Sequence, residues 1–403
     1  MPELSFLPHF PVATHPLLLF GLLLIAGVAG GEFAHRLLRL PRITGYVLTG
    51  MLFGPGGLGL LTEDLLAQSW IFVDIALGLV LFEVGRRLHL RWLIEERYLL
   101  ATGMLESALS FAAVYGALLY FDVHPLHAAV AAAIGVSSSP AVVMLVSREM
   151  RAEGQLTERA LHLVAINSVV AFTLTTMFLS WMHREYRADW GTVILHPLYM
   201  LFGSLVLGYI ACAFALLLAR WLGKSAERQV VMLLGVVVFT IGAAHMFKLS
   251  VLLALLVLGL MVRNLDTRHY VMSVDMGRIG QLFFVVLFVV TGARLALPQL
   301  AAGGLLGLVF ILARFVGKSL GVLILTPFSG VRPGTAGLLC IALTPMSGLA
   351  LALVQETTHV YPAFGAELAA IMMSAVMVLE LIGPLAVQLA LKLSHESHDE
   401  EAP

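Results

Sequence analysis

The chain has 403 residues, of which 60% are hydrophobic and 12% charged, and its formal net charge is −1. Soluble domains carry about 25% charged residues, so this composition indicates a protein that crosses the membrane many times and argues against a nucleic-acid partner. Cys212 and Cys340 stand singly in apolar segments, which excludes a disulfide framework and a cysteine metal site.

A spanning helix needs about 20 apolar residues, and by that measure we expect an all-α fold with about thirteen spanning segments. In chain order they are 16–37, 43–53, 66–84, 99–120, 127–145, 160–181, 197–218, 230–245, 250–262, 279–291, 301–325, 335–353 and 365–391. Residues 1–15 are expected outside the membrane, and 392–403 as a short disordered tail.

Positive charge predicts the orientation of these segments. With the N-terminus outside, the inner loops hold 18 Lys and Arg residues and the outer loops hold 4. This asymmetry follows the positive-inside rule. We therefore expect a multi-pass protein of the plasma membrane (a bacterial inner membrane) with a cytoplasmic C-terminus. The two remaining cations, Arg314 and Lys318, fall inside the segment 301–325.

Two segments contain motifs that break helices. Segment 127–145 contains Gly135–Pro140, in which three serines precede Pro140, and segment 335–353 contains Thr344, Pro345 and Gly348. Irregular backbone survives at membrane depth only beside protein or a water-filled cavity. Such a pair in corresponding positions of two halves indicates the binding site of a secondary transporter built from inverted repeats.

Polar side chains from five segments share one expected depth. Glu106, Asn167 and Lys318 each lie about seven residues from the cytoplasmic end of their segments, which is about 10 Å. The other candidates near this depth are Ser168, Ser137, Ser138, Ser139, Thr344 and Pro345. Ionisable residues inside spans suggest function by default, and ends of half-helices carry opposite partial charges. The pattern favours a small ion-binding site.

Some of these residues also fit other roles. Arg314 competes with Lys318 for the same coupling role, and Lys318 could instead form a structural ion pair. Glu106 could serve helix packing, and for Asp74 and Glu380 we favour a packing or interface role. An enzyme is not indicated, because neither a nucleophile elbow nor a phosphate-binding loop is present.

The motif Pro41–Pro55, with Gly45, Tyr46, Gly50 and Gly54, resembles the opening of the monovalent cation:proton antiporter-2 family. Residues 79–85, 284–293 and 379–384 are similar to motifs in the third, tenth and last helices of that family. The resemblance covers roughly residues 16–391, which we take as the transmembrane antiporter domain.

The resemblance implies a homodimer of thirteen-helix subunits, in which a core (99–181 and 301–391) moves against a dimerisation part. It implies exchange of Na⁺ or K⁺ for protons, with a basic residue in the eleventh helix that matches Lys318 or Arg314. The family also places an aspartate in the sixth helix, where this chain has Asn167-Ser168. The carboxylate that the family uses to bind cation and proton is therefore missing from the sixth helix. In the fifth helix, Ser-Ser-Pro replaces an acidic motif.

These observations lead to three hypotheses. The first is a cation:proton antiporter, serving pH homeostasis, in which Glu106 replaces the missing aspartate, with Asp74 or Glu380 as weaker substitutes. The second is a transporter of an anionic or organic solute on the same fold. The third is a sensor that does not transport. No cofactor, no metal beyond the transported cation, and no partner beyond the lipid membrane, the cation, the proton and a second subunit are expected.

Overall fold

The computed structural model describes residues 16–88, 90–91, 96–186, 190–223, 225–266, 271, 277–295, 297–360 and 362–398. Every regular element within these ranges is helical, which confirms the all-α prediction. Nine of the described helices are long and apolar enough to cross a membrane, and shorter apolar helices accompany them. Each expected segment coincides with one helix or with two consecutive half-helices.

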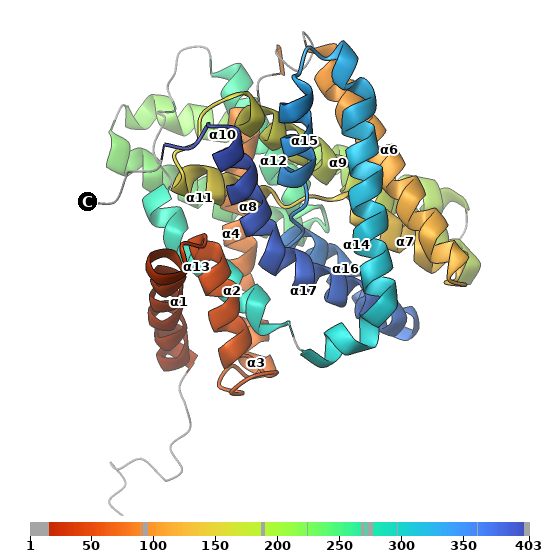
Figure 1. Cartoon of the computed structure of the whole chain (residues 1–403). Coiled ribbons are helices and arrows are strands. Elements are labelled where there is room, and N and C mark those ends of the chain that lie inside the picture. Colours follow the sequence, from red (N-terminus) through yellow and green to blue (C-terminus); the bar gives the residue numbers. More distant parts are fainter. Residues whose placement is uncertain are drawn as a thin grey trace, which may run out of the picture.

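One group of helices, which we call the scaffold group, comes from the first and middle parts of the chain. Its members are α1 (Pro16–Leu38), α2 (Arg42–Phe53), α3 (Glu63–Gln68), α4 (Trp70–Arg87), α10 (Trp190–Leu222), α11 (Ala226–Met246), α12 (Val251–Leu265) and α13 (Gly277–Ala293). Helix α2 packs between α1 and α13, and α12 packs between α4 and α10. Figure 1 shows α1 and α2 side by side at one edge of the molecule.

The remaining helices form the core group. They are α6 (Arg97–Tyr120), α7 (Pro125–Val136), α8 (Pro140–Glu149), α9 (Gln155–Tyr186), α14 (Leu297–Leu325), α15 (Pro333–Ala342), α16 (Gly348–Val360) and α17 (Pro362–Leu393), with the 3-10 turn η1 (Thr326–Phe328) after α14. Helices α6 and α14 lie side by side over much of their length (Figure 1). In each half of this group, the order is a helix, two half-helices and a helix.

The two halves of the core group run in opposite directions. The beginning of α6 and the end of α14 meet, because Leu99 and Val322 line the same small cavity. The beginning of α9 likewise meets the segment that follows α17, where Glu396 accepts a hydrogen bond from Leu156 N at 2.7 Å. This antiparallel relation matches the inverted repeat that the pair of broken segments predicts.

Proline and serine explain the first break. Helix α7 ends at Val136, and the next residues are extended until Pro140 begins α8. Proline suits the first helical position because its missing N–H needs no partner there. The Ser139 hydroxyl caps α8 by accepting from Val142 N at 3.3 Å.

The second break covers residues 343–347, between α15 and α16. Gly348, the last residue of the second motif, is the first residue of α16, just as Pro140 is the first residue of α8. Thr344 and Pro345 lie within the irregular segment, as expected. Proline disfavours a helical conformation of the residue before it, which accounts for the interruption at Thr344.

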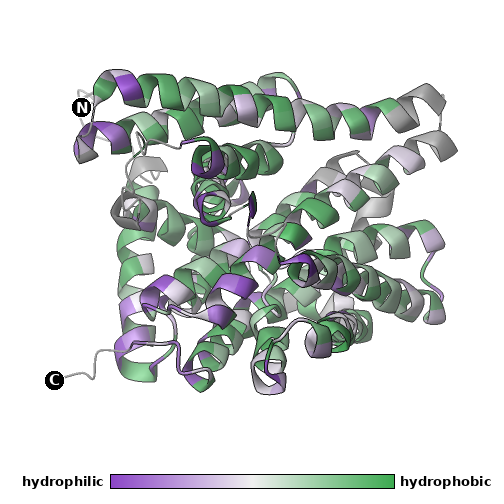
Figure 2. Cartoon of the chain, turned by 90° about the horizontal axis from the view of Figure 1, so that it is seen from above, coloured by the Kyte–Doolittle hydropathy of each residue, from purple (hydrophilic) through white to green (hydrophobic). Residues whose placement is uncertain are grey.

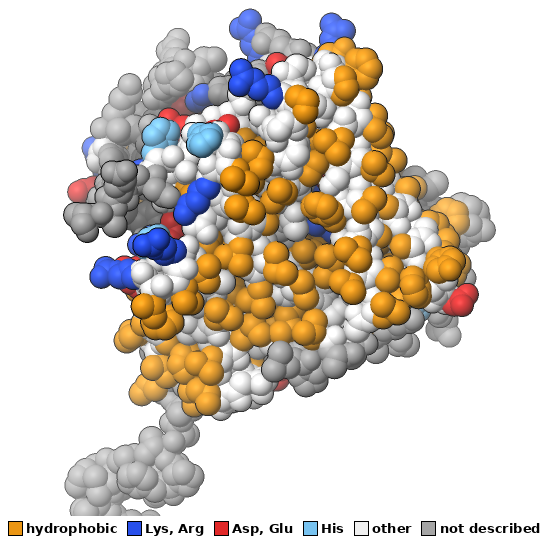
Figure 3. Space-filling model, viewed as in Figure 1, with side chains coloured by type: hydrophobic (Ala, Val, Ile, Leu, Met, Phe, Trp, Pro, Cys, Tyr) orange, Lys and Arg blue, Asp and Glu red, His pale blue; other side chains and the backbone are white. Residues whose placement is uncertain are grey.

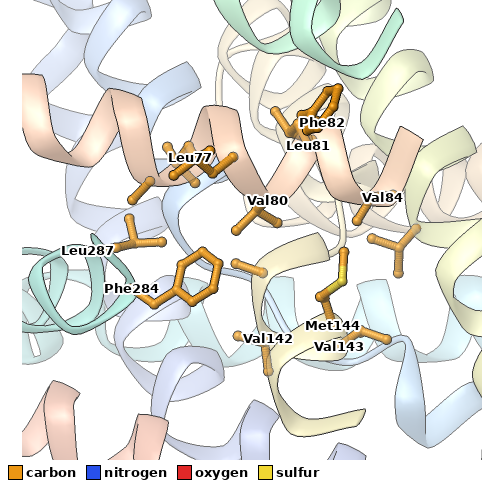
Figure 4. Close-up of a cluster of buried hydrophobic side chains, with 14 of the residues drawn as sticks. Leu77, Val80, Leu81, Phe82, Val84, Val142, Val143, Met144, Phe284 and Leu287 are labelled. Carbon is orange, nitrogen blue, oxygen red and sulfur yellow. The ribbon is translucent and has the colours of Figure 1, made fainter. Parts of the chain in front are cut away.

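The interface between the two groups is apolar near the first break. Figure 4 shows Val80 of α4, Val142 and Met144 of α8, and Phe284 and Leu287 of α13 packed together. Each of these side chains is buried. Apolar contacts are not directional, so no fixed hydrogen-bond pattern links the two groups at this point.

The outer surface fits a lipid environment. Large hydrophobic side chains are exposed on the outer helices, with Ile25 of α1, Leu217 of α10 and Leu305 of α14 more than 60% exposed. Figure 3 shows hydrophobic side chains over most of one face, with Lys and Arg along the upper and left edges. Hydrophobic positions dominate the helices in the view from above as well (Figure 2).

The C-terminal residues up to His398 correct the expectation of a disordered tail. Helix α17 continues to Leu393, and the Glu396 carboxylate accepts from Thr157 N at 2.9 Å and from Thr157 Oγ1 at 2.8 Å. A carboxylate is favourable at a helix N-terminus because the first N–H groups lack partners there. Residues 1–15 and 399–403 lie outside the described residues.

Candidate ion-binding site

The two helix breaks contact each other in the interior of the core group. Ser139 N donates to the Pro345 carbonyl at 2.9 Å, and Ser138 Oγ donates to the Leu343 carbonyl at 2.9 Å. The hydroxyls of Ser139 and Ser347 also share a hydrogen bond. Each break thus satisfies backbone groups of the other, which irregular chain within a membrane requires.

Arg314 of α14 joins the C-terminal ends of α7 and α15. Its guanidinium donates to the carbonyls of Gly135 (2.8 Å), Ser137 (2.7 Å) and Thr344 (2.8 Å). Helix C-terminal ends carry partial negative charge, and the planar guanidinium can reach several acceptors at once. Arg314 is 1% exposed, so its charge is balanced mainly by these carbonyls.

Lys318, one turn further along α14, forms a buried ion pair with Glu106 of α6. Lys318 Nζ bonds to Glu106 Oε1 and donates to the Val136 carbonyl at 2.8 Å. Both residues are at most 1% exposed. Glu106 Oε2 has no hydrogen-bond partner among the described residues. One carboxylate oxygen therefore holds the lysine, while the other remains a spare acceptor.

Asn167 of α9 completes the polar cluster. Its Nδ2 donates to Glu106 Oε1 at 3.3 Å and to Ser138 Oγ at 3.4 Å, while its Oδ1 accepts from Ser107 Oγ at 3.1 Å. The contact with Glu106 fixes the orientation of the amide, because an ionised carboxylate only accepts and Nδ2 is the donor of the amide. Four helices and both breaks therefore meet at this cluster.

Two glycines on α14 allow the ion pair to form. A Cβ on Gly321 would come within 2.2 Å of Glu106 Cα, and a Cβ on Gly317 would come within 2.5 Å of the Leu109 carbonyl. The spacing Gly317-x-x-x-Gly321 is the small-residue pattern that allows close helix packing in membranes. Lys318 lies between these glycines, so the close packing of α14 against α6 brings its side chain next to Glu106.

The structure brings together most, but not all, of the residues singled out in the sequence. Glu106, Asn167, Ser138, Lys318 and Arg314 meet, with Ser139, Thr344 and Pro345 in the adjoining breaks. Ser168 does not join them, because its hydroxyl donates to Val164 O of its own helix at 2.8 Å. The Ser137 hydroxyl likewise donates to Ile134 O at 2.7 Å, so only the backbone of Ser137 takes part.

Other polar contacts differ from the expectations. We expected Arg314 and Lys318 to compete for one role, but they have different partners. Asp74 Oδ2 accepts from His245 Nε2 at 3.0 Å, and Glu380 Oε1 accepts from Thr291 Oγ1 at 2.7 Å. The sequence analysis overlooked Ser107 and Ser347 as contributors. Ser107 directly follows Glu106, and that adjacency was an available signal.

The cluster offers oxygen ligands and mobile charge. Glu106 and Ser138 supply carboxylate and hydroxyl oxygens, which hard cations prefer, while the Asn167 amide oxygen faces Ser107. Among the described residues, no group of three His, Cys, Asp or Glu side chains could hold a resident metal. The arrangement therefore suits a transient, weakly held ion exchanged against the lysine charge.

Two crossed half-helix pairs in inverted repeats, with a buried ion pair beside the crossing, define a secondary active transporter. The chain belongs to the sodium/hydrogen exchanger family, whose transmembrane model matches residues 21–393. Family membership and the fold support cation:proton antiport as its activity, and they confirm the sequence-based prediction at the level of the sodium/hydrogen exchanger family.

Two solved structures of a sodium proton antiporter resemble this chain. One is the antiporter MjNhaP1 from Methanocaldococcus jannaschii at pH 8, with a TM-score of 0.72 and 16% identity over 94% of this chain and 96% of that chain. An electron-microscopy structure of the same antiporter gives a TM-score of 0.68 and 17% identity over 95% and 99%. At this identity the likeness shows the fold. No curated protein sequence matches the chain.

Proposed function

We propose that the protein exchanges Na⁺ or K⁺ for a proton by alternating access, with Glu106 and Lys318 as the coupling pair. The observation that carries this proposal is the buried ion pair beside the crossed breaks. It supplies a charged carboxylate in a chain whose sixth spanning helix has Asn167-Ser168 in place of an aspartate pair. We further assign the chain to the cation:proton antiporter-2 branch on the motif Pro41–Pro55.

The charges that enter and leave during exchange balance at the Glu106–Lys318 pair. A cation that binds Glu106 takes the position of the ammonium as counter-charge, with the Ser138 hydroxyl oxygen as a further ligand. Lys318 then loses one proton to water and keeps its contact with the Val136 carbonyl as a neutral amine. One positive charge enters the cluster and one leaves it, so this pair alone gives electroneutral exchange. Competition of proton and cation for Glu106 itself would give the same balance.

Access is proposed to alternate as the core group shifts against the scaffold group. A cavity of about 360 Å³ lies between the groups, lined by Arg42 and Tyr46 of α2, Glu149 of α8 and Gln281 of α13. Arginines gather at this end of the helices, which we assign to the cytoplasm by the positive-inside rule. We expect the scaffold group to form the homodimer contact in the plasma membrane.

A second candidate is transport of a small anion, and one observation favours it. Arg314 and Lys318 supply two cations to the cluster, whereas Glu106 is the one acidic side chain that hydrogen-bonds with it among the described residues. The N-terminal ends of α8 and α16 adjoin the crossing, and such ends favour anions. We rank this candidate second because Arg314 is already bound by three carbonyls.

Flux in proteoliposomes tests the proposal. A pH gradient is imposed, Na⁺, K⁺ or Li⁺ is added, and dissipation is compared between wild type, Glu106→Gln and the exposed control Glu227→Gln on α11. We expect cation-driven dissipation in wild type and the control, and its loss in Glu106→Gln. Full exchange in Glu106→Gln would refute the coupling role. No dissipation with any cation would favour the anion transporter if anions stabilise the protein in a thermal-shift screen, and the sensor if they do not.

A further inference from the structure

A second fully buried carboxyl group lies outside the cluster. Glu380 of α17 is 0% exposed, and its Oε1 accepts from Thr291 Oγ1 of α13 at 2.7 Å. Its Oε2 has no hydrogen-bond partner among the described residues. Native proteins satisfy nearly all buried polar atoms, so an orphaned carboxyl oxygen calls for an explanation.

The surroundings of Glu380 differ in charge from those of Glu106. Glu106 has Lys318 as a counter-ion and Asn167 as a further donor. Glu380 has one hydroxyl, and no ion pair joins it to a cation in the described part of the chain. A buried ionised carboxylate without a counter-charge is strongly unfavourable, whereas a protonated one is acceptable. The geometry thus favours a carboxyl group that holds a proton in this conformation.

The charged groups on the neighbouring helices have other partners or lie at helix ends. On the helices packed against α17, the charged or imidazole side chains that the structure describes are Arg42 of α2, His127 in the first turn of α7, Arg148 and Glu149 of α8, and Arg314 and Lys318 of α14. Arg42 is the first residue of α2, while Arg148 and Glu149 are the last two of α8. Arg314 and Lys318 are bound by carbonyls and Glu106. On α13, the polar group that faces Glu380 is Thr291.

Glu380 lies where the two groups of helices would move past each other. Its partner Thr291 belongs to the scaffold group, whereas α17 belongs to the core group. One turn further along α17, Gly383 lies against the second break, since a Cβ there would come within 2.9 Å of Pro345 Cα. A shift of the core group would therefore carry Glu380 together with the ion site and separate it from Thr291.

We propose that Glu380 is a second proton-binding site of the transporter, carried by the core group and separate from the Glu106–Lys318 pair. This inference rests on the proposed antiport. The proton is held while Glu380 faces Thr291, passes to water when the shift exposes the carboxyl on one side, and is replaced from water on the other side. Each cycle then moves two protons against one cation, so exchange becomes electrogenic.

Transport under a controlled membrane potential tests the number of protons exchanged per cation. Proteoliposomes with a K⁺ diffusion potential set by valinomycin are used to measure Na⁺ flux for wild type and Glu380→Gln, whose carboxamide imitates the protonated acid. We expect the wild-type flux to respond to the potential and the variant flux to lose that response. A wild type that ignores the potential, or a variant that responds as wild type does, would overturn the proposal.

Infrared spectroscopy of the purified protein gives a readout that does not need transport. A carbonyl band of a protonated carboxyl is expected in wild type and in Glu106→Gln, absent in Glu380→Gln, and shifted in Thr291→Val, which removes the hydroxyl partner. If Glu380→Gln does not fold, Glu380→Asp replaces it, and a band at an unchanged position would count against the assignment. If the wild-type protein shows no cation:proton exchange, the proposed function is refuted. If the wild-type protein exchanges but lacks this carbonyl band, only the Glu380 site is refuted.

Discussion

Gly321 of α14 lies directly against Glu106 of α6, so closely that an added Cβ would come within 2.2 Å of Glu106 Cα. The backbone of one helix thus forms part of the surroundings of the carboxyl on the other. This contact excludes lipid and water from one side of the ion pair with Lys318. Helix packing and ion coupling therefore depend on the same residue.

Gly321→Ala should separate α6 from α14, because the added Cβ would clash with backbone atoms of Glu106, which cannot rotate away. We expect a loss of stability of about 1–3 kcal/mol, as for overpacked cores, and at least a tenfold loss of cation:proton exchange. Thermal unfolding in detergent and proteoliposome flux measure these effects. Gly116→Ala on α6 is the matched control, since its Cβ would meet open space. Equal behaviour of the two variants would contradict the close-packing account.

Glu106 and Lys318 should be coupled energetically. Removing one partner of a buried ion pair costs about 3–5 kcal/mol, whereas replacing both is often neutral. We therefore expect Glu106→Gln and Lys318→Met each to lower the unfolding temperature and the double variant to recover most of the loss without recovering transport. A double-mutant cycle in detergent measures the coupling. Additive single effects would show that the two side chains do not act as a pair.

Arg314→Lys should weaken the crossing even though the charge is kept. Lysine has a compact ammonium and cannot reproduce the planar fork that reaches the Gly135, Ser137 and Thr344 carbonyls. Each hydrogen bond lost to a charged donor costs about 1.5–3 kcal/mol, and we expect a lower unfolding temperature. The exposed Arg228→Lys on α11 serves as the control. An unchanged unfolding temperature in Arg314→Lys would argue against the joining role.

Asn167 and Ser168 should behave differently although they are neighbours in sequence. Asn167→Ala removes contacts with Glu106, Ser138 and Ser107, and we expect the cation concentration for half-maximal exchange to rise about tenfold or more, which is about 1.4 kcal/mol. Ser168→Ala removes a hydroxyl that bonds its own helix and should leave that concentration nearly unchanged. A larger effect at Ser168 would place the cation on the other side of α9.

Hydrophobic segments and helix-breaking motifs were sufficient to predict the helical architecture, because few backbone structures can cross a lipid bilayer. Every backbone group must be satisfied inside the membrane, so apolar length predicts the helices and the motifs at Pro140 and Pro345 predict the breaks. Counting residues from one end also predicted a shared depth for Glu106, Asn167 and Lys318, which the structure brings together.

The side of the helix on which a polar residue lies was less predictable than its depth in the membrane. Ser168 shares the depth of Asn167 but lies about 100° round the helix, and its hydroxyl bonds its own backbone. The distinct partners of Arg314 and Lys318 depend on where the α7 and α15 carbonyls end, which hydropathy does not reveal. The glycines beside Lys318 were visible in the sequence, but their meaning depends on which helix faces them.

Proton release on cation binding is the most direct test of the Glu106–Lys318 exchange. Purified protein in detergent and weakly buffered solution is titrated with Na⁺ or K⁺, and the protons released are compared with the cations bound. The account predicts about one proton per cation in wild type, and neither release nor binding in Glu106→Gln. Cation binding to wild type without proton release would contradict the exchange of cation and proton at this pair.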